Sequence, residues 1–309
     1  MNDKPSPAGA QTQAQTQAQH HAQTRAQSRA QTQVQAQAER GRRFQALHQR
    51  DQAFVIPNPW DAGSARLLAS LGFEALATTS AGYAFTLGRC DNEVERDEML
   101  SHVADLIAAT DLPVSADLEN GFGDDPQMVA ETIRRAAAAG LVGASIEDAT
   151  TRPADPIYPR ALAVERVRAA AEVVKSLPFP FMLTARAENF LVGRKDLADT
   201  IVRLQAYQDA GADVLYAPGL TSSEEIGAVV RAVDRPVNVI MGLPGVRLSV
   251  EDLSALGVRR ISVGSSFARA AWGGFLRAAR EVKERGTFTF GDDAIGYQDL
   301  SSLFKAARR

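Results

Sequence analysis

Acidic side chains follow neighbouring apolar runs in the middle of the chain. Asp117 and Glu119 close the run over residues 113–119, and Glu147 lies near the end of the run over residues 143–148. If both runs are strands, Asp117 and Glu119 are two residues apart and point to the same side, where Glu147 can face them. Three such carboxylates repel one another and stay partly protonated unless a cation neutralises them. Since no histidine or cysteine lies beside them, these oxygen ligands predict Mg²⁺, or else Mn²⁺, rather than zinc.

Other charged residues in the same region have two interpretations each. An acid at the end of a strand can simply cap the following helix, and Asp148 is a candidate for that role. Arg186 lies near the end of the run over residues 181–188. It can be a charge partner of Glu188 or Glu147, or it can bind a substrate carboxylate through two parallel hydrogen bonds. Both interpretations of Arg186 stay open on the sequence alone.

Short apolar runs alternate with longer segments of helical periodicity from about residue 44 onward, and these elements must position the charged groups. The eight runs cover residues 54–57, 75–80, 113–119, 143–148, 181–188, 213–218, 236–241 and 259–264. The helical segments between them include residues 128–139, 164–175 and 197–210. A glycine follows several expected helix ends, as at Gly72, Gly140, Gly211 and Gly257, where a left-handed turn is needed.

This alternation of strands and helices indicates a parallel sheet covered by helices on its faces. Eight units over roughly 240 residues predict a closed (β/α)₈ TIM barrel, with the active site at the carboxyl ends of its strands. An open doubly wound sheet is the alternative. It is disfavoured because no Gly-x-Gly-x-x-Gly turn follows the first run, as a dinucleotide-binding fold requires.

The first 43 residues differ in composition from the rest of the chain. Residues 8–38 are nearly all Ala, Gln, Thr and Ser, with Val34 as their one branched aliphatic side chain. Such a segment cannot bury enough apolar area to offset the entropy of ordering it. The sequence therefore predicts a flexible tail over residues 1–43 and one barrel domain with C-terminal helices over residues 44–309. A helix that forms on a partner and a transit peptide are the alternatives for the tail.

The overall composition excludes several classes of partner. A formal net charge of -3 gives no reason to expect a nucleic-acid partner. No apolar run approaches the roughly 18 residues that a membrane span needs, and the N-terminus lacks the apolar segment of a signal peptide. The single cysteine, Cys90, cannot form an internal disulfide and suits a reducing compartment. We therefore expect a soluble cytoplasmic protein.

Four motifs of the chain resemble those of the isocitrate lyase/phosphoenolpyruvate mutase superfamily, over about residues 44–284. The family's Asp-x-Asp-x-Gly-Tyr-Gly motif is similar to residues 117–123, which read Asp-Leu-Glu-Asn-Gly-Phe-Gly. The other matches are Asp-Asn-Glu at 91–93, Ile-Glu-Asp at 146–148 and Ala-Arg-Ala-Glu at 185–188. All four occur in the expected order on the expected strands, so the resemblance is specific.

The resemblance implies a role for each matching residue. The ligands of a Mg²⁺ ion, some of them through water, would be Asp91, Asp117, Glu119 and Glu147. The groups that bind the substrate carboxylate would be Thr79, Ser80 and Ala81, mostly through backbone N–H groups, with Arg186 on the other side. Asp91 and Arg186 would be the catalytic residues. The family makes or breaks a C–C or P–C bond through a pyruvate-like enolate, whose oxygen Mg²⁺ and a guanidinium can stabilise.

Departures from the family pattern concern the second acid of the first motif and the loop after the fourth strand. Glu119 replaces the family's second Asp, and its extra methylene can move the metal. The lyases carry a catalytic cysteine on the loop, and the mutases and phosphonopyruvate hydrolases carry lysine and asparagine; residues 149–159 contain none of these. Cys90 follows the second strand instead, where we expect a small buried residue. The candidate acid/base or anchoring groups on the loop are Thr150, Arg152, Asp155 and Tyr158.

The motifs together predict a Mg²⁺-dependent carbon–carbon lyase or hydrolase that acts on a small 2-oxo or 2-hydroxy carboxylate. One alternative is a phosphoenolpyruvate mutase-like isomerase that acts on a P–C bond. Another, from a different class, is a catalytically inactive barrel that binds a carboxylate. The resemblance also implies a homodimer or homotetramer, in which the helix after the eighth strand packs on a neighbouring subunit. That helix is expected over residues 267–285, with Trp272 and Phe275 as candidate contacts.

Overall fold

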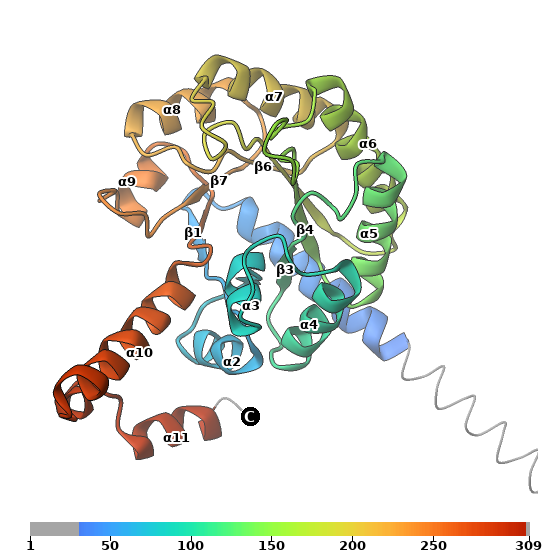
Figure 1. Ribbon diagram of the computed structural model, residues 1–309. Coiled ribbons are helices and arrows are strands. Elements are labelled where there is room, and N and C mark those ends of the chain that lie inside the picture. The colour runs from blue at the N-terminus through green and yellow to red at the C-terminus, as the bar shows by residue number, and fades with distance from the viewer. Residues whose placement is uncertain (1–30, 307–309) are drawn as a thin grey trace, which may run out of the picture.

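Eight parallel strands form a ring that is surrounded by helices (Figure 1). The computed structural model describes residues 31–306. The strands are β1 (Phe54–Ile56), β2 (Leu76–Ala77), β3 (Val114–Asp117), β4 (Gly143–Glu147), β5 (Met182–Arg186), β6 (Val214–Tyr216), β7 (Val237–Ile240) and β8 (Arg260–Ser262). Each strand lies inside one of the predicted apolar runs. The expected (β/α)₈ TIM barrel is confirmed.

Helices follow the strands in turn and form the outer layer of the barrel (Figure 1). They are α2 (Ala62–Ser70), α3 (Ser80–Thr86), α4 (Arg96–Ala108), α5 (Pro126–Ala138), α6 (Arg160–Ser176), α7 (Leu197–Ala210), α8 (Ser223–Ala232), α9 (Val250–Ala255), α10 (Ser266–Arg285) and α11 (Tyr297–Ala306), with a 3₁₀ turn at Thr289–Asp292. The helix predicted after the eighth strand is α10, which begins one residue earlier than expected and ends where expected.

The sequence of α5 shows how these helices form and attach. Asp125 caps its N-terminus by accepting a hydrogen bond from the backbone N–H of Gln127, and Pro126 occupies its first turn, where a missing N–H costs nothing. Val129 and Ile133 are fully buried one turn apart. This apolar stripe packs on the outside of the strands and contributes about 1.5–3 kcal/mol for each large side chain.

The ring closes between its first two strands through one backbone hydrogen bond and the side chain of Asn58, without a continuous ladder. The sheet order runs from β1 through β8 and down to β2, and the Ala77 N–H donates to the Pro57 carbonyl across the remaining gap at 3.1 Å. Asn58, just beyond β1, donates to the Thr78 carbonyl at 2.8 Å. Its side-chain oxygen accepts from the N–H groups of Val263 and Gly264, each at 2.9 Å. Asn58 therefore ties three strand ends together beside the active-site cavity.

Residues 31–48 are helical, so the structure differs from the predicted flexible tail over residues 31–43. Gln37 is 6% exposed, and its amide donates to the carbonyls of Ala137 and Leu141 at 2.8 and 2.9 Å. Phe44 and Leu47 are buried against Phe54 at the amino end of the barrel. The apolar residues that anchor this helix lie beyond the low-complexity segment, which is why composition alone missed it. Residues 1–30 of the predicted tail lie outside the described residues.

His48, at the end of this helix, predicts a pH dependence of stability. It is 3% exposed, and burial, followed by the nearby charge of Arg260, lowers its pKa to about 3. Because the folded protein holds His48 neutral, protons bind the unfolded chain first as the pH falls below about 6.5. The free energy of unfolding should therefore fall by about 2 kcal/mol between pH 7 and pH 5 through this residue. His48→Asn, which can keep the hydrogen bond to the Phe44 carbonyl, should lack this component in chemical denaturation at both pH values. Equal pH slopes in the two proteins would contradict the prediction.

Helix α10 extends away from the ring, and α11 turns back and packs against α2 (Figure 1). Only Ala268 is buried among the residues of α10, while Trp272 is 38% and Phe275 60% exposed. Their rings contact each other edge to face, with centroids 5.7 Å apart. An apolar face of this kind is typical of an interaction surface. Among residues 31–306, no helix is long and apolar enough to cross a membrane.

Candidate active site

The carboxyl ends of the strands surround a cavity of about 390 Å³. All of the residues predicted to act in the site line this cavity, namely Thr79, Ser80, Ala81, Asp91, Asp117, Glu119, Glu147 and Arg186. They come from β3, β4 and β5 and from the segment after β2. The structure therefore brings together every predicted site residue, and the role of each remains a prediction.

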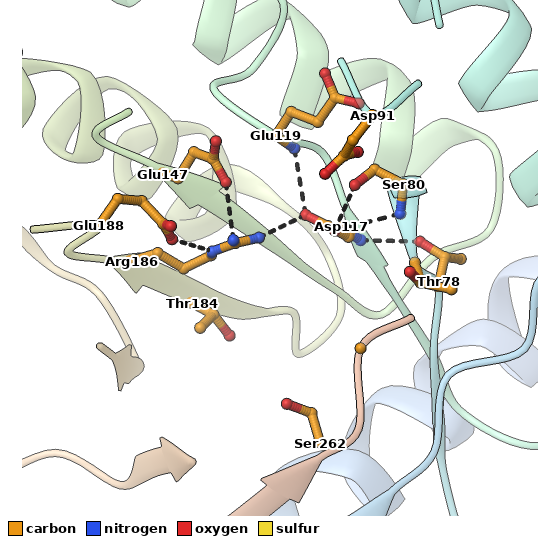
Figure 2. A network of polar contacts seen from close by, with 12 residues as sticks. Thr78, Ser80, Asp91, Asp117, Glu119, Glu147, Thr184, Arg186, Glu188 and Ser262 are labelled. Atoms are coloured by element: carbon orange, nitrogen blue, oxygen red, sulfur yellow. Dashed lines mark hydrogen bonds and ion pairs between the residues drawn. The ribbon is translucent and has the colours of Figure 1, made fainter. Parts of the chain in front are cut away.

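Arg186, at the end of β5, lies at the centre of a group of carboxylates (Figure 2). Each of its three nitrogens pairs with a different acid: Nη1 with Asp117 at 2.7 Å, Nη2 with Glu147 at 3.0 Å and Nε with Glu188 at 2.7 Å. Although burial opposes its charged form, Glu147, Glu188 and then Asp117 raise the pKa of Arg186 well above its ordinary value. Arg186 is thus a charge partner of both Glu147 and Glu188, the two acids that the sequence suggested. Two of its five N–H donors are left for a ligand.

Asp117 is held on its other side by the segment that follows β2. The hydroxyl of Ser80 donates to its Oδ2 at 2.9 Å, and the Ser80 backbone N–H does so at 3.3 Å. The Asp117 N–H donates to the Thr78 hydroxyl at 2.9 Å. Thr79 caps α3 by accepting from the Gly82 N–H. The start of α3 therefore orients Asp117 as well as lining the cavity.

Glu119 reaches the cavity by a route that strand alternation does not describe. β3 ends at Asp117, and Glu119 has a left-handed φ of 50°, which is uncommon for a residue with a side chain. Its Oε1 is buried and has no hydrogen-bond partner among the described residues. Burial, and then the charges of Asp117 and Asp91, raise the pKa of Glu119 to about 8. Glu119 lies on the cavity wall, as predicted. Its left-handed backbone brings it there, and the alternation of side chains along a strand does not, because β3 ends two residues earlier.

The cavity wall carries more negative than positive charge. Five carboxylates (Asp91, Asp117, Glu119, Glu147 and Glu188) share it with two guanidinium groups, that of Arg186 near the mouth and that of Arg260 deeper in the cavity. Burial raises the pKa values of Asp91 and Glu147, although Arg186 opposes the rise in both. Within residues 31–306, no three His, Cys, Asp or Glu side chains are close enough to hold a metal ion by themselves. The unpaired oxygen of Glu119 and the crowded carboxylates fit a hard divalent cation that is held partly through water.

Asp148, next to Glu147, has a structural role that the sequence did not indicate. It is 3% exposed and accepts hydrogen bonds from the Glu188 N–H at 2.8 Å, from Arg203 at 3.1 Å and from the Tyr207 hydroxyl. Helix α6 begins at residue 160 and has no side-chain cap. The interpretation of Asp148 as a helix cap was therefore wrong. It fixes the backbone that carries Glu188.

The loop after β4 contributes less to the cavity than expected. Of its four candidate groups, Thr150 lines the cavity, whereas Arg152, Asp155 and Tyr158 do not. Arg152 pairs with Asp124 at 2.7 Å. The buried Tyr158 hydroxyl also donates to Asp124 at 2.6 Å, and burial followed by this bond raises the pKa of Tyr158 to about 12. Tyr158 therefore lies outside the cavity, and its raised pKa disfavours a role as a base near neutral pH.

Cys90 is exposed, contrary to the expected small buried residue. Its N–H donates to Glu93 at 2.8 Å, and it does not line the cavity.

Cys90→Ser should therefore retain most of the activity. The change replaces one atom of an exposed side chain that does not line the cavity, so its effect should stay within about 0.5 kcal/mol in both stability and kcat/KM. Thermal unfolding and steady-state kinetics on the same sample measure both. A large loss of turnover with unchanged stability would show that the thiol takes part in the reaction.

Comparisons with known proteins identify the family. Residues 44–283 match the family model described as phosphoenolpyruvate phosphomutase. The chain belongs to this family. The matched range contains all eight strands and every predicted site residue.

Individual relatives agree with this assignment. The solved structure of a Burkholderia cenocepacia J2315 protein assigned as a lyase/mutase is 63% identical, with a TM-score of 0.85, and covers 87% of this chain and 97% of its own. An uncharacterised protein of Mycobacterium tuberculosis is 32% identical over 78% of this chain and 89% of its own length. A 2-methylisocitrate lyase of Halalkalibacterium halodurans is 26% identical over 86% of this chain and 93% of its own.

These comparisons confirm the resemblance found in the four motifs. The protein is an enzyme of the isocitrate lyase/phosphoenolpyruvate mutase superfamily, whose members are Mg²⁺-dependent lyases and mutases that act on small carboxylates.

Proposed function

We propose that this phosphoenolpyruvate phosphomutase family member is a Mg²⁺-dependent lyase or hydrolase that cleaves a C–C bond of a small 2-oxo or 2-hydroxy carboxylate through an enolate. The observation that carries the proposal is the group of five carboxylates around Arg186 at the mouth of the barrel, with one Glu119 oxygen unpaired. A relative of similar length is a 2-methylisocitrate lyase, which supports a carboxylate substrate of this kind.

The residues that would hold the ion are Asp91, Asp117, Glu119 and Glu147, in part through water. When bound, Mg²⁺ supplies Lewis acidity that favours negative charge on a substrate oxygen. Ser80 and Arg186 already fix the orientation of Asp117, and the other carboxylates would complete the site partly through water. Glu119, whose pKa is about 8, would give up its proton.

Arg186 and the start of α3 would bind the substrate carboxylate from opposite sides. The guanidinium keeps two N–H donors beyond its three ion pairs, and Thr79, Ser80 and Ala81 line the facing wall. A fixed guanidinium beside the reacting carbon stabilises charge that develops on the enolate oxygen without reorganising during the reaction. Asp91, which lines the cavity from the segment after α3, is the remaining predicted catalytic residue.

The test is turnover on a panel of 2-oxo and 2-hydroxy acids with Mg²⁺ and with a chelator in its place. The panel contains oxaloacetate, 2-methylisocitrate and phosphonopyruvate. Mg²⁺-dependent C–C cleavage of either of the first two supports the proposal. Conversion of phosphonopyruvate to phosphoenolpyruvate would instead identify a mutase-like isomerase. Binding of these acids without turnover of any would identify an inactive carboxylate-binding barrel.

We also propose that the protein forms a homodimer or homotetramer through α10. Trp272 and Phe275 lie exposed and in contact on this helix, which leaves the ring and has one buried residue. Water contact with large aromatic side chains is unfavourable, and a second copy of the chain would remove it.

Trp272→Glu combined with Phe275→Glu should lower the mass of the particle to that of the monomer. Charged side chains at the centre of an apolar interface lose hydration without gaining a partner, which costs several kcal/mol. Light scattering after gel filtration measures the mass. Leu71→Glu is the matched control, because Leu71 is 70% exposed but lies after α2 on the ring. A monomeric wild-type protein would contradict the prediction.

A further inference from the structure

Arg260 is a buried cation inside the barrel with no acidic partner among residues 31–306. It is the first residue of β8, is 5% exposed and lines the active-site cavity. Its contacts are with uncharged groups. Nε donates to the Asn238 side-chain oxygen at 2.9 Å, Nη2 donates to the Thr184 hydroxyl at 3.0 Å, and Nη1 lies 3.4 Å from His48 Nε2.

The groups around Arg260 do not supply a negative charge at neutral pH. His48 is held neutral, since burial lowers its pKa to about 3. Tyr216, whose charge would favour that of Arg260, stays protonated because burial raises its pKa. Burial lowers the pKa of Arg260 itself to about 10, so the guanidinium remains protonated. A buried guanidinium in contact with neutral groups alone is unfavourable unless an anion completes the site.

The open side of Arg260 faces the cavity. At the amino end of the barrel, Phe44 and Leu47 of the N-terminal helix pack with Phe54 and Met182, and the His48 ring lies edge to face against Phe54 with centroids 5.0 Å apart. These side chains close the barrel below Arg260. An anion therefore has to approach it through the cavity.

Small side chains leave room for such an anion. Ser115, Ser145 and Ser262 line the cavity, whereas the interior of a TIM barrel is usually filled by bulky branched residues. Thr184, which contacts Arg260 at 3.0 Å, precedes Arg186 by two residues on β5. Two residues of a strand span roughly 6–7 Å, so the deep cation lies about one layer of side chains below the level of Arg186.

We propose that Arg260 binds a second carboxylate of the substrate at the deep end of the cavity. The inference rests on the proposed function, which puts the first carboxylate at Arg186. The carboxyl carbons of an extended five-carbon diacid lie roughly 5 Å apart. Charge-assisted hydrogen bonds of about 2.8 Å at each end bring the reach to roughly 10 Å, so such an acid is long enough to contact both levels.

Two acids of equal chain length test this assignment. 2-Oxoglutarate and 2-oxovalerate both have five carbons and a 2-oxo acid group, and they differ in the distal carboxylate. Calorimetric titration of the Mg²⁺-loaded wild-type protein should show at least about 10-fold tighter binding of 2-oxoglutarate. Arg260→Met should abolish this preference and leave the affinity for 2-oxovalerate within about threefold. The ratio of the two affinities is insensitive to a general loss of folded protein.

Asn238→Asp provides a second variant in case Arg260→Met fails to fold. It places a carboxylate against Arg260 Nε, where Asn238 now accepts at 2.9 Å, and thereby supplies from the protein the anion that the substrate would bring. The preference for 2-oxoglutarate should be lost while thermal stability is kept or raised.

Each other outcome overturns the inference. Equal binding of the two acids by wild type would refute the role of Arg260 and leave the proposed function standing. A preference that survives in either variant, with only the melting temperature lowered, would show that Arg260 is purely structural. Binding of neither acid by wild type would count against both the inference and the proposed 2-oxo acid substrate.

Discussion

Asp117→Ala is expected to lower Mg²⁺-dependent turnover by more than about 100-fold, since changes to groups that merely support a metal ligand already cost 10- to 100-fold. The fold should survive the change. The Asp117 side chain is 20% exposed at the cavity, and its removal leaves Glu147 and Glu188 to balance Arg186. It also removes one source of the repulsion that raises the pKa of Glu119. The melting temperature should therefore shift by no more than a few degrees.

Calorimetric titration with Mg²⁺ and measurement of kcat/KM on the same variant test the assignment. Asp155→Ala is the matched control, because Asp155 is an exposed carboxylate on the loop after β4 that does not line the cavity. It should bind Mg²⁺ and turn over substrate like wild type. If Asp117→Ala binds the ion with unchanged affinity, Asp117 is not part of the metal site.

The barrel could be predicted because its strands are covered by helices and therefore give continuous apolar runs. Positions such as Gly211, which ends α7 with a φ of 109°, marked the helix ends. The closure between β1 and β2 could not be predicted. It depends on the amide of Asn58, and a single asparagine after an apolar run gives no signal of three specific backbone partners.

The candidate site was predictable to the extent that position on a strand determines position around the cavity. Asp117, Glu147 and Arg186 end consecutive strands, so their meeting follows from the topology. The conformation of Glu119 and the burial of Asp148 depend on φ angles and partners that no pattern of residue types encodes. The sequence did not single out Arg260, because this residue begins β8 and the active site was expected at the carboxyl ends of the strands.

Arg186→Lys should lower kcat/KM by about 1.5–3 kcal/mol, the range for hydrogen bonds to charged groups. The guanidinium uses three nitrogens for three carboxylates and has two N–H donors left. A lysine ammonium has three N–H donors in all and no planar fork. It can keep the charge near Asp117 but cannot hold all three acids and also present parallel hydrogen bonds to a substrate carboxylate. Mg²⁺ affinity should change little because the local charge is preserved.

Arg186→Lys should also lower stability, because it weakens three ion pairs. A second buried arginine is therefore needed to decide whether Arg186 binds the substrate. Arg203→Lys is the matched control: Arg203 is also buried and pairs with Asp148 at 3.1 Å and Asp199 at 2.8 Å, but it does not line the cavity. It should lower the melting temperature and leave the kinetics of the folded protein nearly normal. Kinetics measured well below both melting temperatures should separate the two variants. If Arg186→Lys loses stability alone, as Arg203→Lys should, then Arg186 holds the carboxylates in place and does not bind the substrate.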